Sequence, residues 1–548
     1  MTMRAMARVS IVLGAAAIWG CGPGARQSLP AAAPASSAGH ATGEGSGPRV
    51  LRVGSYRGIA GGFSAIQDAV NVAKPGDWVL VGPGVYHEAG SPQAGVLVTT
   101  PNVHLRGMDR NGVVVDGAGS KSTPCSPQAA DQDPGPLDAG GSPVGRNGIE
   151  VLKADGVSVE NLTVCNFLAG SAGNGNAIWF NGGDDSGQIG LGAFRGAFLT
   201  ASSTFFDPAN PAMSAQYGIF ASNSRGPGVI EDSYASNMAD SSIYVGACPD
   251  CNTVVRRIHA ENSAVGYSGS NSGGHLVLED SEWNDNRSGM VPNSLANDDP
   301  PSPQDGACPD HPTKSCTLIQ GNWVHDNNNP NTPAVGLTAG APVGTGIEIS
   351  GGRNNTVRHN LVSNHGSWGI LVHDYPDTSP ASVPTYCAGG IPDLSTALGP
   401  ACYFIAYGNR VIANRLEYNG FFGNPTNGDL GDATIPFPPP LPPQPGNCFA
   451  KNCDPSGGAP SSDPANIQDP SVLGTCGVPG PGGDTGVLFA EIICAAYGPA
   501  SGFCPPGSSY PQPTTVVMKP IPRDLPGMAD PCLGVPDNSW CAHERDRW

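Results

Sequence analysis

The sequence predicts an all-β protein whose main body is a right-handed parallel β-helix of roughly 9 to 12 coils, with an N-terminal capping helix and a Pro- and Cys-rich tail. Three observations carry this prediction: a strand-like tetrad that recurs along the chain, a nearly constant spacing between its copies, and a second motif with the same spacing. Glycine and proline supply 77 and 55 of 548 residues, as expected of a chain that turns often.

In the recurring tetrad, apolar residues flank a variable one, which is the alternation of a half-buried strand. Copies lie at residues 148–151, 177–180, 218–221, 242–245, 346–349 and 369–372. Gly218 precedes Ser242 by 24 residues, and Gly346 precedes Gly369 by 23. One period therefore fits both intervals.

The second motif is an apolar phrase that ends in an asparagine, at Asn237, Asn262 and Asn286. A unit this short cannot bury its apolar side chains alone, whereas stacked coils about 4.8 Å apart form a continuous core. We therefore expect an internal ladder of isoleucines and ladders of stacked amides at the turns. The alternative is an antiparallel sandwich, which would not hold asparagine at one phase of a fixed period.

The segment 62–81 places apolar residues on one helical face and then turns at Pro75 and Gly76 into a strand, so it predicts a helix that covers the first coil. This segment, continuing through residues 82–88, resembles the start of the pectate-lyase-like superfamily. That superfamily of right-handed β-helices includes pectate lyases, polygalacturonases, alginate epimerases and many bacterial surface proteins. The resemblance covers roughly residues 49–419, and it implies the fold far more specifically than an activity.

The first residues have the form of an export signal. Arg4 and Arg8 precede an apolar run that ends at Trp19, and Gly20 and Cys21 follow. This pattern resembles the bacterial lipobox, in which the cysteine is lipidated, although Trp19 is unusual there and plain secretion is the alternative. We predict a cell-envelope or secreted protein that contacts the membrane only through a lipid on Cys21. The predicted organisation is a signal peptide at 1–21, a flexible tether at 22–49, the β-helix at 50–425 and a C-terminal extension at 426–548.

Charge and cysteine content agree with export. The net charge of −19 would repel phosphate backbones, so nucleic acid is excluded as a partner, and we expect a monomer. Sixteen cysteines favour disulfides. Close pairs suggest local loop bridges: Cys248 with Cys251, Cys308 with Cys316, and Cys448 with Cys453. Zinc is the competing interpretation of the first pair.

Cys165 falls within a predicted coil strand, so we expect it to be a buried free thiol. Seven cysteines then remain on each side of residue 426, which requires at least one bridge between tail and body. We expect the tail, which begins with a polyproline segment at 436–445, to wrap or cap the solenoid as disulfide-pinned loops.

The residue between two inward apolar ones points outward, so the tetrads predict one exterior row. The row comprises Glu150, Trp179, Phe198, Phe220, Tyr244, Glu348 and Leu371. Its aromatic members predict a platform for sugar rings, with Glu150, Trp179, Phe198, Phe220 and Tyr244 as the substrate-binding residues. The alternative is that inserted loops cover the row and the aromatics form a secondary core.

Candidate catalytic residues gather near one coil. Glu348, His373 and Asp374 could provide the base for uronic-acid lysis or the carboxyl groups for hydrolysis. Neighbouring turns add candidates at Arg358, His359 and His365. Against this cluster, histidines beside turns are commonly solvated.

Asp184 and Asp185 faintly resemble the paired aspartates of polygalacturonases. The Gly-His-Gly and Arg-Ile-Lys segments of that family and the Asp-Pro-His element of alginate epimerases are missing, so those activities lose support. Calcium is a candidate cofactor at two acidic stretches, with disordered acidic insertions as the alternative. These stretches contain Asp131, Asp133 and Asp138, and Asp298, Asp299 and Asp305.

Together these features predict a surface β-helix protein that binds, and in a lyase-like reaction cleaves, an extracellular or envelope polysaccharide. Fold analogy carries the sugar part of this prediction. The alternative is a non-catalytic adhesion or structural protein, with the solenoid as a rigid stalk. Whether the protein is an enzyme stays open at this stage; a lyase or a glycoside hydrolase is the expected class if it is one.

Overall fold

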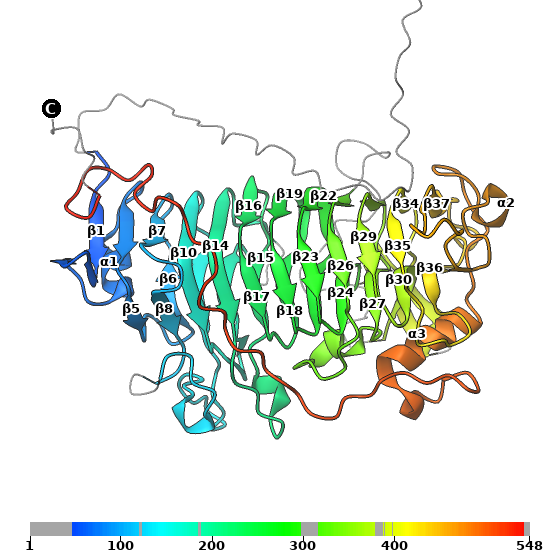
Figure 1. Cartoon of the computed structure of the whole chain (residues 1–548), viewed down its shortest axis with the longest axis horizontal. Helices are drawn as coiled ribbons and strands as arrows, with labels where there is room; N and C mark the ends of the chain where they lie inside the picture. The colour runs from blue at the N-terminus through cyan, green and yellow to red at the C-terminus, as the bar shows by residue number, and fades with distance from the viewer. Residues whose placement is uncertain are drawn as a thin grey trace, which may run out of the picture.

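The computed structural model describes residues 47–119, 123–184, 188–296, 316–378, 387, 389–396 and 398–541. In these residues the chain winds into an elongated solenoid whose strands run across its long axis (Figure 1). An eleven-stranded sheet contributes one strand to each coil, so the predicted coil number of roughly 9 to 12 is confirmed. Cys21, most of the predicted tether, Asp185, Asp298, Asp299, Asp305 and Cys308 lie outside the described residues.

The strands are divided between two large parallel sheets. The eleven-stranded sheet comprises β6 (Ala94–Val98), β9 (Asn147–Leu152), β13 (Ile178–Asn181), β15 (Tyr217–Ser222), β18 (Ser241–Gly246), β21 (Val265–Ser270), β24 (Ser288–Asn293), β27 (Thr345–Ser350), β30 (Trp368–His373), β36 (Gly428–Ala433) and β38 (Ser462–Asp463). The twenty-stranded sheet takes up to two strands from each coil. The first of the two are β1 (Val50–Val53), β4 (Trp78–Val81), β7 (His104–Gly107), β16 (Gly228–Glu231), β19 (Cys248–Arg256), β22 (Ser272–Glu279), β25 (Thr317–Gln320), β28 (Thr356–Arg358), β34 (Arg410–Ile412) and β37 (Cys448–Ala450). The second are β5 (Gly84–Tyr86), β8 (Val113–Asp116), β17 (Tyr234–Ser236), β20 (His259–Glu261), β23 (Glu282–Asn284), β26 (Trp323–His325), β29 (Leu361–Ser363) and β35 (Arg415–Glu417), while β10 (Val157–Cys165) and β14 (Phe194–Ser202) span both places.

Smaller elements decorate the coils. The short strands are β2 (Ser55–Tyr56), β3 (Ile59–Ala60), β11 (Ala169–Gly170), β12 (Gly173–Asn174), β31 (Tyr375–Asp377), β32 (Ile391–Thr396) and β33 (Gly399–Phe404). The helices are α1 (Ile66–Val72), α2 (Pro470–Leu473) and α3 (Val487–Tyr497), with 3-10 turns η1 (Ala129–Asp131), η2 (Pro211–Met213), η3 (Gly336–Gly340) and η4 (Pro499–Ser501). Helix α1 packs Ile66 and Val70 into the core at the first coils, so the predicted capping helix is confirmed.

The predicted isoleucine ladder forms the core behind the eleven-stranded sheet. In-register pairing joins Ile149 to Ile178, then Ile219 and Ile243, and later Ile347 to Ile370. All six side chains are fully buried. Each contributes roughly 1.5–3 kcal/mol by leaving water.

The predicted amide ladders also form. In one of them, the Nδ2 atoms of Asn322, Asn360 and Asn414 each donate to the Oδ1 of the next asparagine, at 3.0, 3.0 and 2.9 Å, and the ladder ends at Asn452. The same amides donate to or accept from buried backbone groups of neighbouring coils. Each rung thus satisfies polar groups at a turn that water cannot reach.

The twenty-stranded sheet bends where each coil turns from its first strand to its second. From β10 onward a residue with positive φ stands at the bend, such as Asp232 (φ 52°) and Arg257 (φ 52°). Phe198 (φ 53°) is one of these bend residues, within β14. The predicted place of Phe198 in the exterior row is therefore wrong: its strand belongs to the twenty-stranded sheet, because the apolar rhythm of residues 196–199 also fits a bent strand.

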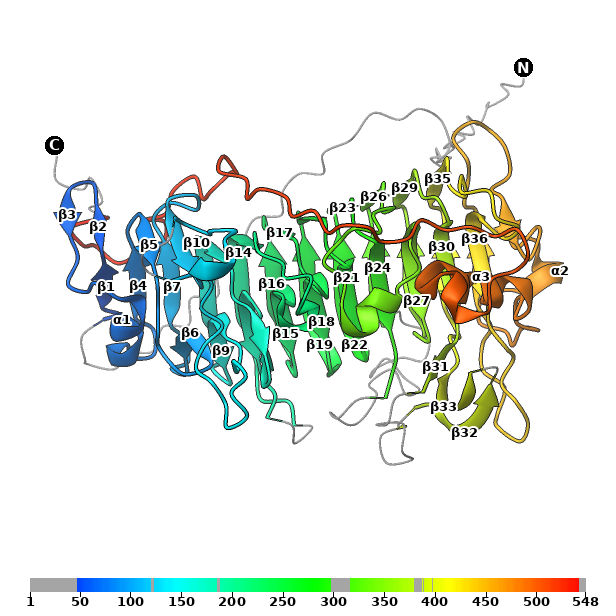
Figure 2. The ribbon, with the colours of Figure 1, turned by 90° about the horizontal axis from the view of Figure 1, so that it is seen from below.

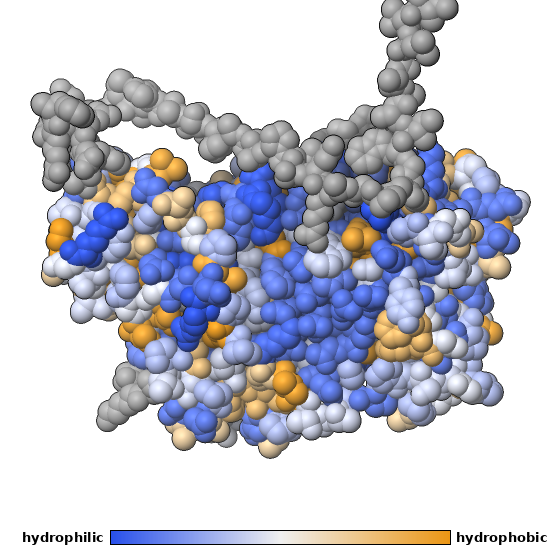
Figure 3. Space-filling view, in the orientation of Figure 1, coloured by the Kyte–Doolittle hydropathy of each residue, from blue (hydrophilic) through white to orange (hydrophobic). Residues whose placement is uncertain are grey.

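Charged outward side chains of the twenty-stranded sheet pair with one another. Glu231 accepts from Arg195 at 2.5 Å and from Arg256 at 2.7 Å, and Glu160 joins Arg106 to Arg195. A broad hydrophilic area covers the middle of this side of the molecule (Figure 3). These charges neutralise one another in ion pairs, so we do not place the functional site on this face.

Six disulfides lie among the described residues, and this number indicates an extracellular or secreted protein. Cys248 and Cys251 are bonded as predicted, which excludes zinc there. Cys448 bonds Cys476, so its predicted pairing with Cys453 is wrong; residues 470–476 fold back beside β37.

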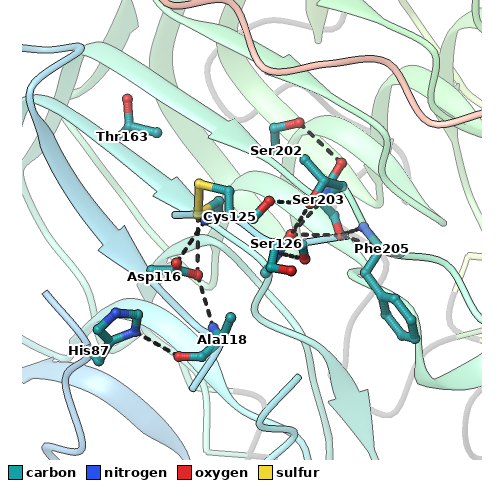
Figure 4. Close-up of a disulfide and its surroundings, with 12 residues drawn as sticks. His87, Asp116, Ala118, Cys125, Ser126, Thr163, Ser202, Ser203 and Phe205 are labelled. Carbon is teal, nitrogen blue, oxygen red and sulfur yellow. Dashed lines mark hydrogen bonds between the residues drawn. A yellow bond between two sulfur atoms is a disulfide. The ribbon is translucent and has the colours of Figure 1, made fainter. Parts of the chain in front are cut away.

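Cys165 is not the predicted free thiol but bonds Cys125 (Figure 4). The side chain leaves β10 on the side away from the core, where the loop before β9 reaches it. Asp116 fixes that loop by accepting from the backbone N–H of Cys125 at 2.8 Å and of Ala118 at 2.9 Å. The predicted disulfide between tail and body rested on a free Cys165, so the cysteine count no longer requires it.

The tail extends the solenoid and then returns along it. Strands β36, β37 and β38 continue both large sheets past residue 425. Residues 510–541, which we call the strap, then run from the α3 end of the solenoid to its first coils (Figures 1 and 2). Asn262 and Asn237 donate to the strap carbonyls of Val517 and Lys519. The prediction that the tail wraps the solenoid is confirmed.

We expect Asn414→Ala to destabilise the protein by about 2–4 kcal/mol, because it leaves the Asn360 N–H and the Val357 carbonyl buried without partners. The measurement is the urea midpoint of unfolding. Asn210→Ala, at an exposed asparagine, is the matched control and should change stability by less than about 0.5 kcal/mol. Equal midpoints for the two variants would mean that the amide ladder carries no stability.

Candidate functional site

The exterior row of the eleven-stranded sheet exists, with Phe198 removed from it. Strand pairing places Glu150 beside Trp179, Trp179 beside Phe220, and Phe220 beside Tyr244. The row then continues through Ser268 and Val291 to Glu348, and Leu371 follows on the next coil. Four predicted substrate-binding residues thus occupy consecutive coils.

The aromatic members contact one another closely. The rings of Trp179 and Phe220 stack with centroids 5.1 Å apart and planes 7° apart, and Tyr217 stacks on Phe220 at 4.5 Å. Tyr244 meets Phe220 edge-on at 4.7 Å. Since faces within the stack cover one another, the stacked rings present edges to a ligand rather than the flat faces that the sequence suggested.

Glu150 precedes the aromatic stretch, and Leu97 of β6 lies beside it on the preceding coil. Its carboxylate accepts from Asn147 Nδ2 at 3.0 Å and Asn181 Nδ2 at 2.9 Å. These amides hold a nearly buried anion beside Trp179 and orient it.

At the other end of the aromatic stretch lies a pocket of about 350 Å³, a size typical of sites for small ligands. Its floor is the exterior row from Tyr244 to Glu348, and its walls are η3, α3 and the segment that begins with β31. Its polar lining residues include Tyr217, Asp240, Tyr244, Ser268, Glu348, His373, Asp374, Tyr375, Asp377 and Tyr497. The rim is exposed and apolar at Leu337 and Leu398.

Two of the predicted catalytic residues meet on the pocket floor. His373 Nε2 lies 2.8 Å from Glu348 Oε1, and the ring's Nδ1–H donates to the Asp374 carbonyl at 2.7 Å. His373 is 5% exposed and Glu348 3%. Burial alone would lower the pKa of His373, but the hydrogen bond and negative charge of Glu348 outweigh it, so this pKa is raised. The pair can therefore hold or release a proton at Nε2.

Asp374 holds neighbouring segments in place and does not share the proton of His373. Its carboxyl accepts from the backbone N–H groups of Ala406 and Ile435, both at 2.8 Å, and from the Tyr403 hydroxyl at 3.2 Å. Burial raises the pKa of Asp374 to about 8. The side chain fastens the segments after β33 and β36 behind the pocket, and its oxygens are occupied.

A second carboxyl group lies on the opposite side of the pocket. Asp240 accepts from Tyr217 Oη at 3.0 Å and from Ser241 Oγ at 2.5 Å. Ser241 Oγ also lies 2.5 Å from Ser268 Oγ on the next coil. Burial raises the pKa of Asp240 to about 6.

The sequence did not predict Asp240 and its partner Tyr217 as site residues, although Tyr217 directly precedes a recognised tetrad. It also missed the α3 wall, because the tail carries no trace of the coil period.

The other predicted candidates lie elsewhere. His365 belongs to an amide ladder, where Nδ1 lies 2.9 Å from Asn419 Oδ1, and burial lowers its pKa to about 4. Arg358 donates to Gln320 on the twenty-stranded sheet, whose exterior also carries His359 at a bend. These three residues do not join the pocket, since their coil positions precede the turn to the eleven-stranded sheet.

The acidic loops show no cation cage among the described residues. Asp133 pairs with Arg146 at 3.0 Å, and Asp138 accepts backbone N–H groups of its own turn. Asp184 pairs with Lys153. Among the described residues, one acidic and sulfur-bearing group is compact enough for a metal ion, Asp116 with Cys125 and Cys165, but its sulfurs are bonded to each other.

Comparison with known proteins agrees with this architecture. A family profile described as "Right handed beta helix region" matches residues 195–379. The chain folds as a right-handed parallel β-helix. No curated protein matches it in sequence.

Three solved structures illustrate the likeness. The A-module of mannuronan C-5 epimerase AlgE4 from Azotobacter vinelandii is 15% identical, with a TM-score of 0.40 over 71% of this chain and 89% of its own. The A-module of AlgE6 from the same organism is 12% identical, with a TM-score of 0.41 over 71% and 94%. The tailspike of E. coli bacteriophage HK620, in complex with pentasaccharide, is 13% identical, with a TM-score of 0.36 over 75% and 60%.

None of the helices in the described part of the chain is long and apolar enough to cross a membrane.

We expect the pKa of His373 to lie above the ordinary value near 6.5. In Glu348→Gln this pKa should fall below that value, because burial then acts without the opposing charge. The stabilisation of the native state by this ion pair is present below pH 6.5 and is lost as pH rises through the higher folded pKa. The measurement is NMR titration with carbon-labelled histidine. His365 is the internal control and should stay neutral down to about pH 5 in both proteins. Identical His373 titrations in the two proteins would contradict the pairing.

Proposed function

We propose that the protein binds an extracellular or envelope polysaccharide along the exterior row and holds it in the pocket at the His373–Glu348 pair. The observation that carries this proposal is that the aromatic stretch Trp179–Tyr244 leads directly to a polar, buried pocket floor. Carbohydrates need both parts, since their CH groups contact apolar ring surface, here the exposed ring edges, and their hydroxyls need oriented polar partners. One of the similar structures, the HK620 tailspike, is a complex with a pentasaccharide, so a carbohydrate ligand agrees with it by analogy.

The charge of the pocket restricts the ligand. Asp240 and Asp377 line it, His373 balances the charge of Glu348, and none of its described lining residues is Lys or Arg. A uronate carboxylate would meet these acids at short range in a partly desolvated site, which is repulsive. Neutral and amino sugars are therefore the favoured ligands, and a uronate requires a neutralising cation such as Ca²⁺.

Lyase-like cleavage is the second candidate function, and the His373–Glu348 pair favours it. In that reaction the neutral imidazole of His373 takes the proton from the carbon next to the uronate carboxylate. The C–H electron pair forms the new C=C bond as the glycosidic C–O bond breaks. Glu348 stabilises the resulting imidazolium, which then gives its proton to the leaving oxygen. Hydrolysis by Glu348 and Asp240 fits less well: a backbone separation of three strand spacings, about 14 Å, lies between their coils, and Tyr217 and Ser241 hold Asp240 at its own coil. Two-carboxylate hydrolysis works at about 5–9.5 Å.

A purely structural stalk is the remaining alternative. It predicts that loops cover the whole row, whereas Trp179 and Phe220 stay partly exposed. We further propose that a lipid on Cys21 anchors the protein in the cell envelope, with the residues up to 49 as a tether and plain secretion as the other outcome.

We expect residues 22–548 to bind one polymer of a panel comprising dextran, laminarin, chitosan, pectate, alginate and hyaluronan, tested with and without calcium. Trp179→Ala and Glu348→Gln should each weaken that binding at least tenfold, about 1.4 kcal/mol or more, in titration calorimetry. Trp323→Ala, on the twenty-stranded sheet, is the matched aromatic control and should leave affinity unchanged.

Absorbance of unsaturated uronate, recorded in parallel, tests the lyase. A rise with pectate, alginate or hyaluronan that depends on calcium and is lost in His373→Ala supports cleavage. Binding with a flat trace leaves a binding protein. Binding to no polymer of the panel contradicts the proposed function and favours the stalk.

A further inference from the structure

Just beyond Glu348, other parts of the chain cover the exterior row completely. The next residue of the row is Leu371, which pairs in register with Glu348 and is fully buried, and Gly431 follows it. Leu371 packs with Trp368 beneath Leu488 and Ile492 of α3. A Cβ added to Gly431 would meet Leu371 Cδ1 at 2.9 Å and Leu488 Cδ2 at 3.6 Å, so no ligand can lie there.

Helix α3 is fastened in this place. Arg287, which is 6% exposed, donates to the carbonyls of Ala341 at 2.7 Å and Ala496 at 2.6 Å, and so ties the end of α3 to the loop of η3. The backbone N–H of Val343 donates to the Ala495 carbonyl, and Cys494 bonds Cys504 at the same end of the helix. The obstruction is therefore part of the folded molecule.

The row stays accessible in the opposite direction. Ser268 and Val291 carry the pocket floor from Glu348 back to Tyr244, and the partly exposed Phe220 and Trp179 continue it. The distance from the Tyr244 strand to the Glu348 strand is three strand spacings, about 14 Å. A chain laid along the row can thus enter past the aromatics but cannot leave past Glu348.

We propose that this groove, closed at one end, accepts the terminus of a polysaccharide chain, so that the His373–Glu348 pair meets a terminal sugar rather than an internal one. This inference rests on the proposed function. An internal segment would have to continue along the sheet on both sides of the pair, and α3 occupies one of those sides. Ligands are therefore chains with a free end, and any modification proceeds from that end.

The experiment compares each polymer of the panel at full length with the same polymer cut to about one tenth of its length. At equal mass the cut sample has about ten times as many ends, so end binding lowers the dissociation constant in mass units about tenfold. Binding of internal segments leaves that constant unchanged. Borohydride reduction of the cut sample then distinguishes the reducing end from the other one, because it opens only the reducing-end ring.

The outcomes separate the two proposals. Binding that follows the number of ends supports both. Binding that follows mass keeps the proposed function and overturns the closed groove. No binding by either sample overturns the proposed function itself.

Trp179→Ala gives an independent readout of direction. For the polymer that binds, a trimer should keep its affinity in this variant, since it occupies only the pocket, whereas a longer oligomer should bind at least tenfold more weakly. Equal losses for both lengths would contradict entry past the aromatics.

Discussion

Register between coils is the constraint on which the rest of the structure depends. Each coil hydrogen-bonds to the next at one strand spacing, so a residue type that recurs at one phase of the sequence is stacked on its copies. Isoleucines become a core, asparagines become amide ladders, and outward residues become rows. The same rule that buries Ile178 beneath Ile219 puts Trp179 against Phe220. A site on such a scaffold needs no special loop, because adjacent coils already place its side chains side by side.

Fold and site differ in how far the sequence predicts them, and the reason is periodicity. The isoleucine and asparagine phases recur many times, so a single misread copy does not change the fold. Phe198 shows the limit: one copy of the apolar rhythm fitted two places in a coil, and only the positive φ at the bend decides between them. Cys165 shows it again, since inside and outside of a buried strand look alike until the opposing loop is known.

The pocket was predictable in its floor and not in its walls. Glu348 lies in one tetrad and His373 directly follows the next one; register pairs His373 with Ser350, two residues after Glu348 on the same face, so the two side chains can meet. Asp240, η3 and α3 come from turns, an insertion and the tail, which obey no period. The role of Asp374 could not be inferred either, because its partners, Ala406 and Ile435, are backbone groups of two insertions. Tertiary contacts of irregular segments therefore decide which part of a regular surface becomes a site.

The tail links stability to that choice. A bare solenoid ends in unpaired strands and an uncovered core, and both ends must be covered. Here α1 covers the first coils, while the tail adds the last coils and then folds α3 over Trp368 and Leu371. The helix that protects this apolar part of the row also forms one wall of the pocket. The packing of α3 therefore both buries Leu371 and closes the groove. A change that loosened α3 to open the groove would expose the apolar cluster beneath the helix. The strap, pinned to Asn237 and Asn262, keeps the same segment attached along the length of the solenoid.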